Sequence, residues 1–197
     1  FDQLSMEPKT LAAYTDVSRK MLLQSGLDIS AFVISDLRAS LGQELDRVVF
    51  NGSGSGSEPS GILNNAGIST VALGTNGAAL TWGNLVDLET AISQANANGE
   101  SMAYVTTKQA RGKLSNTLNV PTYGDFIWQN SPNPKLPGEG VVNGLRAVAT
   151  TLLPSNLSKG SASGVCSSMI LGAWADLLVG QWGAGLDIVL DPYTHSS

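Results

Sequence analysis

A long amphipathic run between Asp28 and Gly52 limits the folds open to this chain more than any other feature of its sequence. Apolar side chains return there every three or four residues, which is the spacing of one face of an α-helix. Asp28 is placed to cap the run and Asn51-Gly52 to end it. A spine helix at 28–51, of about 22 residues and roughly 33 Å, is therefore predicted. We expect it to pack an apolar stripe against a sheet, and the stripe consists of Ile29, Val33, Leu37, Leu41, Leu45 and Val48.

A glycine- and serine-rich stretch at 52–63 follows this helix. Its composition indicates a flexible surface loop that leads back to a strand. Phosphate binding is not indicated, because the stretch lacks the Gly-Lys-Ser/Thr of a P-loop and has Ser57 where the third glycine of a dinucleotide fingerprint would stand. A dinucleotide fingerprint would also precede a helix, whereas this stretch follows one.

The rest of the chain mixes helical and strand patterns without the regular alternation of a doubly wound sheet, which favours the α+β class. No internal repeat is seen. The expected elements are a strand, a turn and a short helix within 1–25 (Ser18 as its N-cap, Gly26 as its end), a helix from Thr81 to Gly99, a strand at 102–106, a short helix capped by Thr107, an irregular loop at 119–144, a strand at 144–150, a turn-rich link at 158–164, and a strand alternating through Leu186, Ile188 and Leu190.

Composition narrows the classes of function. Charged residues make up 14% of the chain and apolar residues 42%, which argues against disorder. The net charge of −5, without a basic cluster, disfavours nucleic-acid binding. The 22 glycines and the scarcity of charge suggest a molecule that neighbours cover over much of its surface. We expect a soluble chain that begins within a longer protein, because it starts at Phe1 instead of Met and shows neither a signal peptide nor a membrane span.

Residue types that carry catalysis are scarce. His195 lies near the chain end and Cys166 is the single cysteine, so a Ser-His-Asp triad and a zinc site both lack a credible set of residues. Asp87 and Glu89 lie two apart on a helix and do not face each other. The sequence therefore predicts no catalytic, cofactor-binding or metal-binding residue, and an enzyme is left as a residual alternative. Burial in a core or a subunit interface is expected for Cys166 and for the tryptophans at Trp82, Trp128, Trp174 and Trp182.

A series of short motifs follows in a fixed order along nearly the whole chain. They are Pro8-Lys9-Thr10-Leu11 with 17–22, the long helix with Asn51-Gly52, Glu58-Pro59-Ser60-Gly61-Ile62-Leu63, Met102-Ala103-Tyr104-Val105-Thr106 before a short helix, Gly144-Leu145-Arg146-Ala147-Val148, 172–180, and 185–193. In this order they resemble the major capsid proteins of tailed bacteriophages, whose fold is the Hong Kong 97-type capsid fold.

The resemblance implies a peripheral and an axial domain. A peripheral-domain-like part with the spine helix would cover 1–77, a mainly axial-domain-like part 78–185, and a late strand returning toward the peripheral domain 186–197. Family members carry an N-terminal arm and an extended hairpin before the position of Phe1, and a further strand and tail after Tyr193. Some members form a Lys–Asn isopeptide crosslink promoted by a Glu, but those residues would lie outside this chain and none is assigned.

The function that the resemblance implies is that of a structural major capsid subunit, not an enzyme. Such subunits self-assemble as hexamers and pentamers into an icosahedral phage or prophage shell that encloses DNA. The implied partners are further copies of the chain, with scaffold, protease and portal proteins, and DNA held non-specifically; no cofactor and no membrane are expected. The implied location is the virion, after assembly in the bacterial host cytoplasm.

The same fold also builds the shells of bacterial encapsulin-type nanocompartments, which is the alternative function. The arm and the hairpin reach across neighbouring subunits in such lattices and supply much of the area that a stable interface needs. We therefore expect the 197-residue chain alone to be a monomer or a small oligomer.

Overall fold

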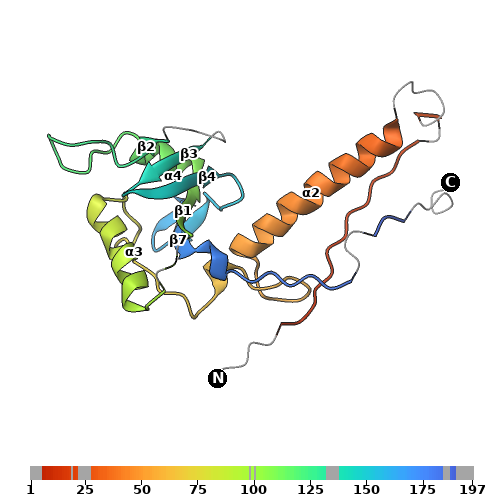
Figure 1. The fold of residues 1–197 in the computed structure, drawn as a ribbon, viewed down its shortest axis with the longest axis horizontal. Helices are drawn as coiled ribbons and strands as arrows, with labels where there is room; N and C mark the ends of the chain where they lie inside the picture. Colours follow the sequence, from red (N-terminus) through yellow and green to blue (C-terminus); the bar gives the residue numbers. More distant parts are fainter. Residues whose placement is uncertain are drawn as a thin grey trace.

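The computed structural model describes residues 6–18, 20–21, 28–97, 99, 101–131, 138–183 and 187–189. Helices and strands are mixed along the chain, so the α+β class is confirmed. Figure 1 shows a sheet flanked by α3 and α4, with α2 projecting away from it. The elements are α2 (Ile29–Asn51), η1 (Ile62–Asn64), α3 (Trp82–Gln94), β1 (Met102–Thr107), α4 (Lys108–Leu114), β2 (Gln129–Asn130), β3 (Glu139–Val142), β4 (Leu145–Thr150), β5 (Leu157–Lys159), β6 (Ala162–Cys166), β7 (Met169–Ala173) and η2 (Trp174–Asp176).

Helix α2 is continuous over 23 residues, as the sequence predicts. The backbone N–H of Ala31 donates to Asp28 Oδ1 at 3.1 Å, which confirms Asp28 as the N-cap. At the other end the N–H of Gly52 donates to the carbonyl of Val48 at 2.8 Å. Both boundaries therefore have local causes that can be read from neighbouring residues.

The predicted burial of the apolar stripe of α2 against a sheet is wrong for this chain. No residue of α2 is buried, and Leu45 is 46% exposed. Near its C-terminal end the helix meets other elements, where the Phe50 ring lies edge-on to Trp174 with centroids 6.0 Å apart. Its earlier turns lead away from the sheet (Figure 1). The remaining stripe residues, Ile29, Val33, Leu37, Leu41 and Val48, are half-buried, so the predicted register of the face holds.

The five-stranded sheet has the order β2-β3-β4-β1-β7. β1 and β4 pair in parallel, with Val105 opposite Val148, and the other pairs are antiparallel. The predicted strands at 102–106 and 144–150 are confirmed. Between them, Thr107 caps α4 as predicted, because its side chain accepts a hydrogen bond from the N–H of Ala110 at 3.2 Å.

The hydrophobic core lies between one face of this sheet and helices α3 and α4. Alternate residues of β1 and β4 point into it, and Tyr104 and Ala147 are fully buried there. Leu85 of α3 is 0% exposed and Leu114 of α4 is 1% exposed. The sequence of α3 supports this placement, since the N–H of Thr81 donates to Asn84 Oδ1 at 3.0 Å and fixes where the helix begins.

Two segments predicted to be irregular form strands. The loop expected at 119–144 contains β2 and β3, and the link expected at 158–164 belongs to the antiparallel hairpin of β5 and β6. Both predictions were wrong because the strands have two to five residues, too few for an alternating pattern to show.

Other expected boundaries differ or lie outside the described residues. Residues 6–18 form no strand, although the N–H of Met21 does donate to Ser18 Oγ at 3.2 Å. α3 ends at Gln94 with Ala95 as its cap, earlier than the expected Gly99. Residues 187–189 are not a strand, while Gly26, Leu186, Leu190 and His195 lie outside the described residues. Within the described ranges, no helix combines the length and apolarity that crossing a membrane requires.

The difference between the core and the α2 stripe leads to a prediction on stability. Leu85→Ala removes a fully buried side chain and should lower the free energy of unfolding by about 2–5 kcal/mol. Leu41→Ala on half-buried α2 leaves no closed cavity and should cost less than about 2 kcal/mol. Urea denaturation of both variants measures the difference, and equal costs would mean that the stripe is covered in the isolated chain.

Candidate functional site

The strongest concentration of specific contacts outside the core lies where α2 meets the glycine-rich stretch. Gly61 N donates to Gly52 O at 2.9 Å, and Gly54 N donates to Pro59 O at 3.2 Å. Ser53 and Ser60 form an isolated antiparallel bridge between these two bonds. The prediction of a flexible loop is therefore wrong, because the two ends of the stretch are hydrogen-bonded to each other.

Glycine is required at both closing positions of this turn. A Cβ atom on Gly52 would lie 2.7 Å from Val48 O and still closer to Pro59 O. A Cβ atom on Gly61 would lie 2.7 Å from the N atom of Asn51 and would press on the N atom of Gly52. Since all these neighbours are backbone atoms, no side-chain movement can relieve the contact.

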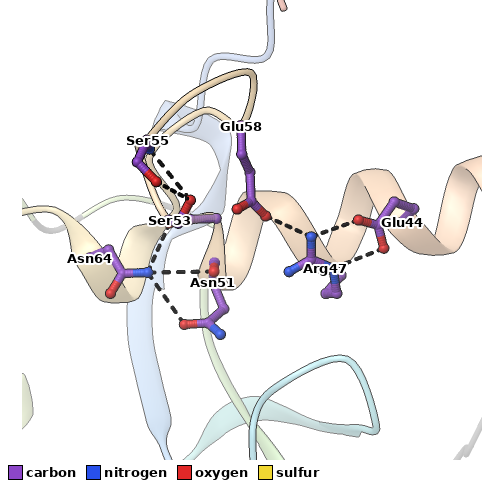
Figure 2. Close-up of polar contacts among 8 residues, drawn as sticks. Glu44, Arg47, Asn51, Ser53, Ser55, Glu58 and Asn64 are labelled. Atoms are coloured by element: carbon purple, nitrogen blue, oxygen red, sulfur yellow. Dashed lines mark hydrogen bonds and ion pairs between the residues drawn. The ribbon is translucent and has the colours of Figure 1, made fainter. Parts of the chain in front are cut away.

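An ion-pair group joins the same turn to the last turns of α2 (Figure 2). Arg47 lies 2.6 Å from Glu44, three residues earlier in the helix, and 2.6 Å from Glu58 in the turn. The Arg47 side chain is 40% exposed, so solvent screens these pairs and their main effect is to orient the turn.

The charge state of Glu58 depends on these neighbours. A hydrogen bond from the Ser53 side chain and one from Arg47 lower the pKa of Glu58 to about 2. A hydrogen bond with Arg47 also lowers the pKa of Glu44, and the two carboxylates raise the pKa of Arg47. The group is therefore fully charged at neutral pH.

Asn64 of η1 completes the junction (Figure 2). Its side-chain N–H donates to Gly52 O at 2.8 Å and reaches Asn51 O and Asn51 Oδ1 at 3.4 Å. The carbonyls at a helix C-terminus lack intrahelical partners, and Asn64 supplies one for the residues that end α2. Sequence analysis missed Arg47, Glu58 and Asn64, and the spacing of Glu44 and Arg47 on one helix face was the one signal that could have indicated part of the group.

Among the described residues that were considered from the sequence, which do not include His195, the structure brings no catalytic group together. Glu89 turns toward the sheet while Asp87 is exposed on α3, and Cys166 is a half-buried free thiol. In the part of the chain that the structure describes, no three His, Cys, Asp or Glu side chains are grouped as metal ligands would be. The absence of catalytic and cofactor-binding residues stays a prediction.

The tryptophans have different environments. Trp128 is in the core at 3% exposure and Trp82 packs against it, whereas Trp182 is 53% exposed. Trp174 donates from Nε1 to Ala103 O at 2.8 Å and lines a groove of about 530 Å³ between the end of α2 and the second face of the sheet. The charged side chains in the wall of this groove are Asp46 and Arg146, and Arg146 forms an ion pair with Glu139. The groove thus presents an apolar surface without an acid–base pair.

The close contact of Gly52 and Gly61 predicts the effect of adding one methyl group. Gly61→Ala should lower the free energy of unfolding by roughly 1–3 kcal/mol, because the added Cβ meets fixed backbone. Gly42→Ala is the matched control, since Gly42 lies within α2 with no atom near its Cβ position, and it should stabilise by about 0.5–1 kcal/mol. Thermal or urea unfolding gives both values, and a neutral Gly61→Ala would contradict a rigid turn.

The low pKa of Glu58 predicts how stability depends on pH. The folded pKa of about 2 lies below the ordinary 4.5, so the ionised carboxylate stabilises the folded chain above pH 4.5 and this contribution is lost as the pH falls toward 2. The Tm of the wild-type chain should therefore exceed that of Glu58→Gln at neutral pH, and the gap should close in the acid range. Asp87→Asn, on the exposed face of α3, is the control for the removal of one surface carboxylate. A constant Tm difference at all pH values would contradict the assignment.

Two comparisons with known proteins agree with each other. A family model described as the phage capsid family matches residues 1–197. A major capsid protein of Halomonas phage phiHAP-1 is 25% identical over 197 residues, which is 100% of this chain and 29% of that protein. The chain therefore spans less than a third of the length of this relative.

Proposed function

The chain belongs to the phage capsid family, and from this membership we propose that it is part of the major capsid subunit that forms a phage or prophage shell. The similar Halomonas phage protein, itself a major capsid protein, supports this role. The role is structural, and we propose that the chain carries no catalytic activity. Shell formation then depends on surfaces that meet other copies of the chain.

The observation that carries the proposal is the amount of apolar surface that the single chain leaves uncovered away from its core. Phe32 of α2 is 71% exposed, Tyr14 is 90% exposed, and Leu178 is 67% exposed. Soluble monomers rarely expose large apolar surfaces, whereas interfaces bury them. With 14% charged residues, copies of the chain also repel one another weakly. Contacts with other protein surfaces would cover the exposed apolar side chains, and the weak repulsion between copies would permit such contacts.

We propose the Hong Kong 97-type capsid fold and its division into domains for this chain. The peripheral-domain-like part, 1–77, would contain α2 and the turn that closes on Gly52 and Gly61. The mainly axial-domain-like part, 78–185, would contain the five-stranded sheet with α3 and α4. Residues 186–197 would return toward the peripheral domain. The buried hydrophobic core lies within 78–185 and includes no residue of α2. This supports a domain boundary near residue 77.

The partners follow from the proposed role. Further copies, arranged as hexamers and pentamers of an icosahedral shell, are the main ones, with scaffold, protease and portal proteins during assembly. Packaged DNA is bound non-specifically at most, because the net charge is −5. The proposed location is the virion, reached after assembly in the host cytoplasm.

Electron microscopy of the full-length protein expressed in bacteria tests the shell. Closed icosahedral particles are the expected result, and a soluble monomer under all assembly conditions would contradict the proposal. The contents of the particles separate the two kinds of shell. Particles that package nucleic acid support a phage head, whereas small particles that enclose a folded enzyme would favour an encapsulin-type nanocompartment.

A variant on α2 tests whether its exposed face is used in assembly. Phe32→Ser in the full-length protein should leave folding within about 0.5 kcal/mol, because the side chain is exposed, and should reduce shell yield strongly, since a buried interface aromatic contributes about 2 kcal/mol or more. Gln43→Ser changes an exposed polar residue of the same helix and should assemble normally. Sedimentation velocity measures the yield, and normal shells from Phe32→Ser would show that this face is free.

A further inference from the structure

A polar contact group holds α3 on the sheet and ends on the turn between β3 and β4. Glu89 of α3 accepts a hydrogen bond from the Tyr104 hydroxyl at 2.6 Å. The same carboxylate accepts from Asn143 Nδ2, which lies 2.7 Å from each of its oxygens. Tyr104 is buried in β1, whereas Asn143 is exposed. One carboxylate thus ties together three elements that are far apart in the sequence.

The turn that carries Asn143 is a tight hairpin connection with left-handed backbone at both central residues. Asn143 has φ +48° and Gly144 has φ +76°. Asparagine followed by glycine is the pair that this geometry favours, because both residues tolerate positive φ. The space around the Cβ position of Gly144 is open, so glycine is present for its backbone conformation and leaves its own N atom unshielded by a side chain.

An asparagine before an unshielded glycine amide can lose its side-chain nitrogen. The deprotonated backbone N of Gly144 attacks Cγ of Asn143, a C–N bond forms, and ammonia leaves with a proton from water. The resulting five-membered succinimide is then hydrolysed by one water molecule to aspartate or isoaspartate. The net reaction consumes one water and releases ammonia, and no oxidation occurs.

The contact with Glu89 opposes this reaction in the folded chain. The Asn143 side chain has to turn back toward its own backbone before Cγ can meet the N atom of Gly144, and this movement breaks both hydrogen bonds to Glu89. Hydrogen bonds to a carboxylate are stronger than neutral ones. Donation from Nδ2 also makes the carboxamide carbon less electrophilic. Ring closure therefore requires that the Asn143 side chain first leaves Glu89.

We propose that Asn143 is a deamidation site that its contact with Glu89 protects, and that deamidation loosens α3 from the turn between β3 and β4. The product at position 143 is a carboxylate that faces the carboxylate of Glu89, and it lacks the N–H groups with which the Asn143 amide donates to Glu89. The Tyr104 hydroxyl can donate to one of them and not to both. Repulsion between the two favours the separated state of α3. The proposal goes beyond the proposed function and holds whether or not the chain forms shells.

Two other Asn–Gly pairs in the described residues serve as internal controls. At Asn51-Gly52 the N atom of Gly52 is engaged with Val48 O at 2.8 Å. At Asn76-Gly77 the Asn76 Oδ1 accepts from Ser161 N at 3.0 Å. Both pairs are held by contacts unrelated to Glu89, so changing Glu89 should leave their rates unaltered.

Peptide mapping by mass spectrometry measures the deamidation rate at Asn143. The chain is incubated in mildly alkaline buffer, either folded or unfolded in urea. Folded wild-type chain should react at Asn143 much more slowly than unfolded chain. Glu89→Gln should raise the folded-state rate at Asn143 by about tenfold or more, which corresponds to the loss of one charge-assisted hydrogen bond. Asp87→Asn, two residues away on the exposed face of α3, should leave it unchanged. A rate at Asn143 that is the same in Glu89→Gln and wild type would overturn the protective role.

If Glu89→Gln unfolded the chain, the deamidation rates at Asn51 and Asn76 would rise as well. A second variant, Asn143→Asp, tests the proposal in that case. Asn143→Asp supplies the product directly, and amide hydrogen exchange should show faster exchange in α3 than Asn143→Ser shows, with β1 and β4 still protected. Exchange in α3 that is equal in Asn143→Asp and Asn143→Ser would overturn the proposed consequence.

Discussion

The contact between the backbones of Gly52 and Gly61 decides where the longest helix of the chain points. Because the two residues have no Cβ, the turn that follows α2 closes on the helix end through backbone hydrogen bonds. Arg47 and Glu58 then fix the outer side of the turn, and Asn64 fixes its return. The result is a stiff junction at one end of α2, while the other end extends away from the sheet (Figure 1).

The described residues divide into a part that has a buried hydrophobic core and a part that has none. The sheet, α3 and α4 share a core in which Leu85 and Tyr104 are fully buried. Helix α2 has no buried residue, although its apolar side chains keep the spacing of a helix that is covered on one face. The proposed role in a shell would use such surfaces, because contacts between subunits bury apolar area that a single chain leaves exposed.

Two groups of polar contacts in the described residues join segments that are distant in the sequence. Arg47 connects α2 to the turn, and Glu89 connects α3 to β1 and to the hairpin at Asn143. Both contacts hold elements in place, which agrees with membership in the phage capsid family.

The sequence by itself determined the elements whose causes are local. The caps at Asp28, Thr81 and Thr107 fix helix starts within one turn, and alternation marks β1 and β4. The order of motifs also indicated the family, since order along the chain needs no knowledge of contacts. The tertiary structure alone decided the closure of the turn after α2, the strands β3, β5 and β6, the contact of Glu89 with Asn143, and the exposure of the α2 stripe. These features arise from pairs of residues that are distant in sequence or separated by a tight turn, and such pairs leave no periodic signal in the chain.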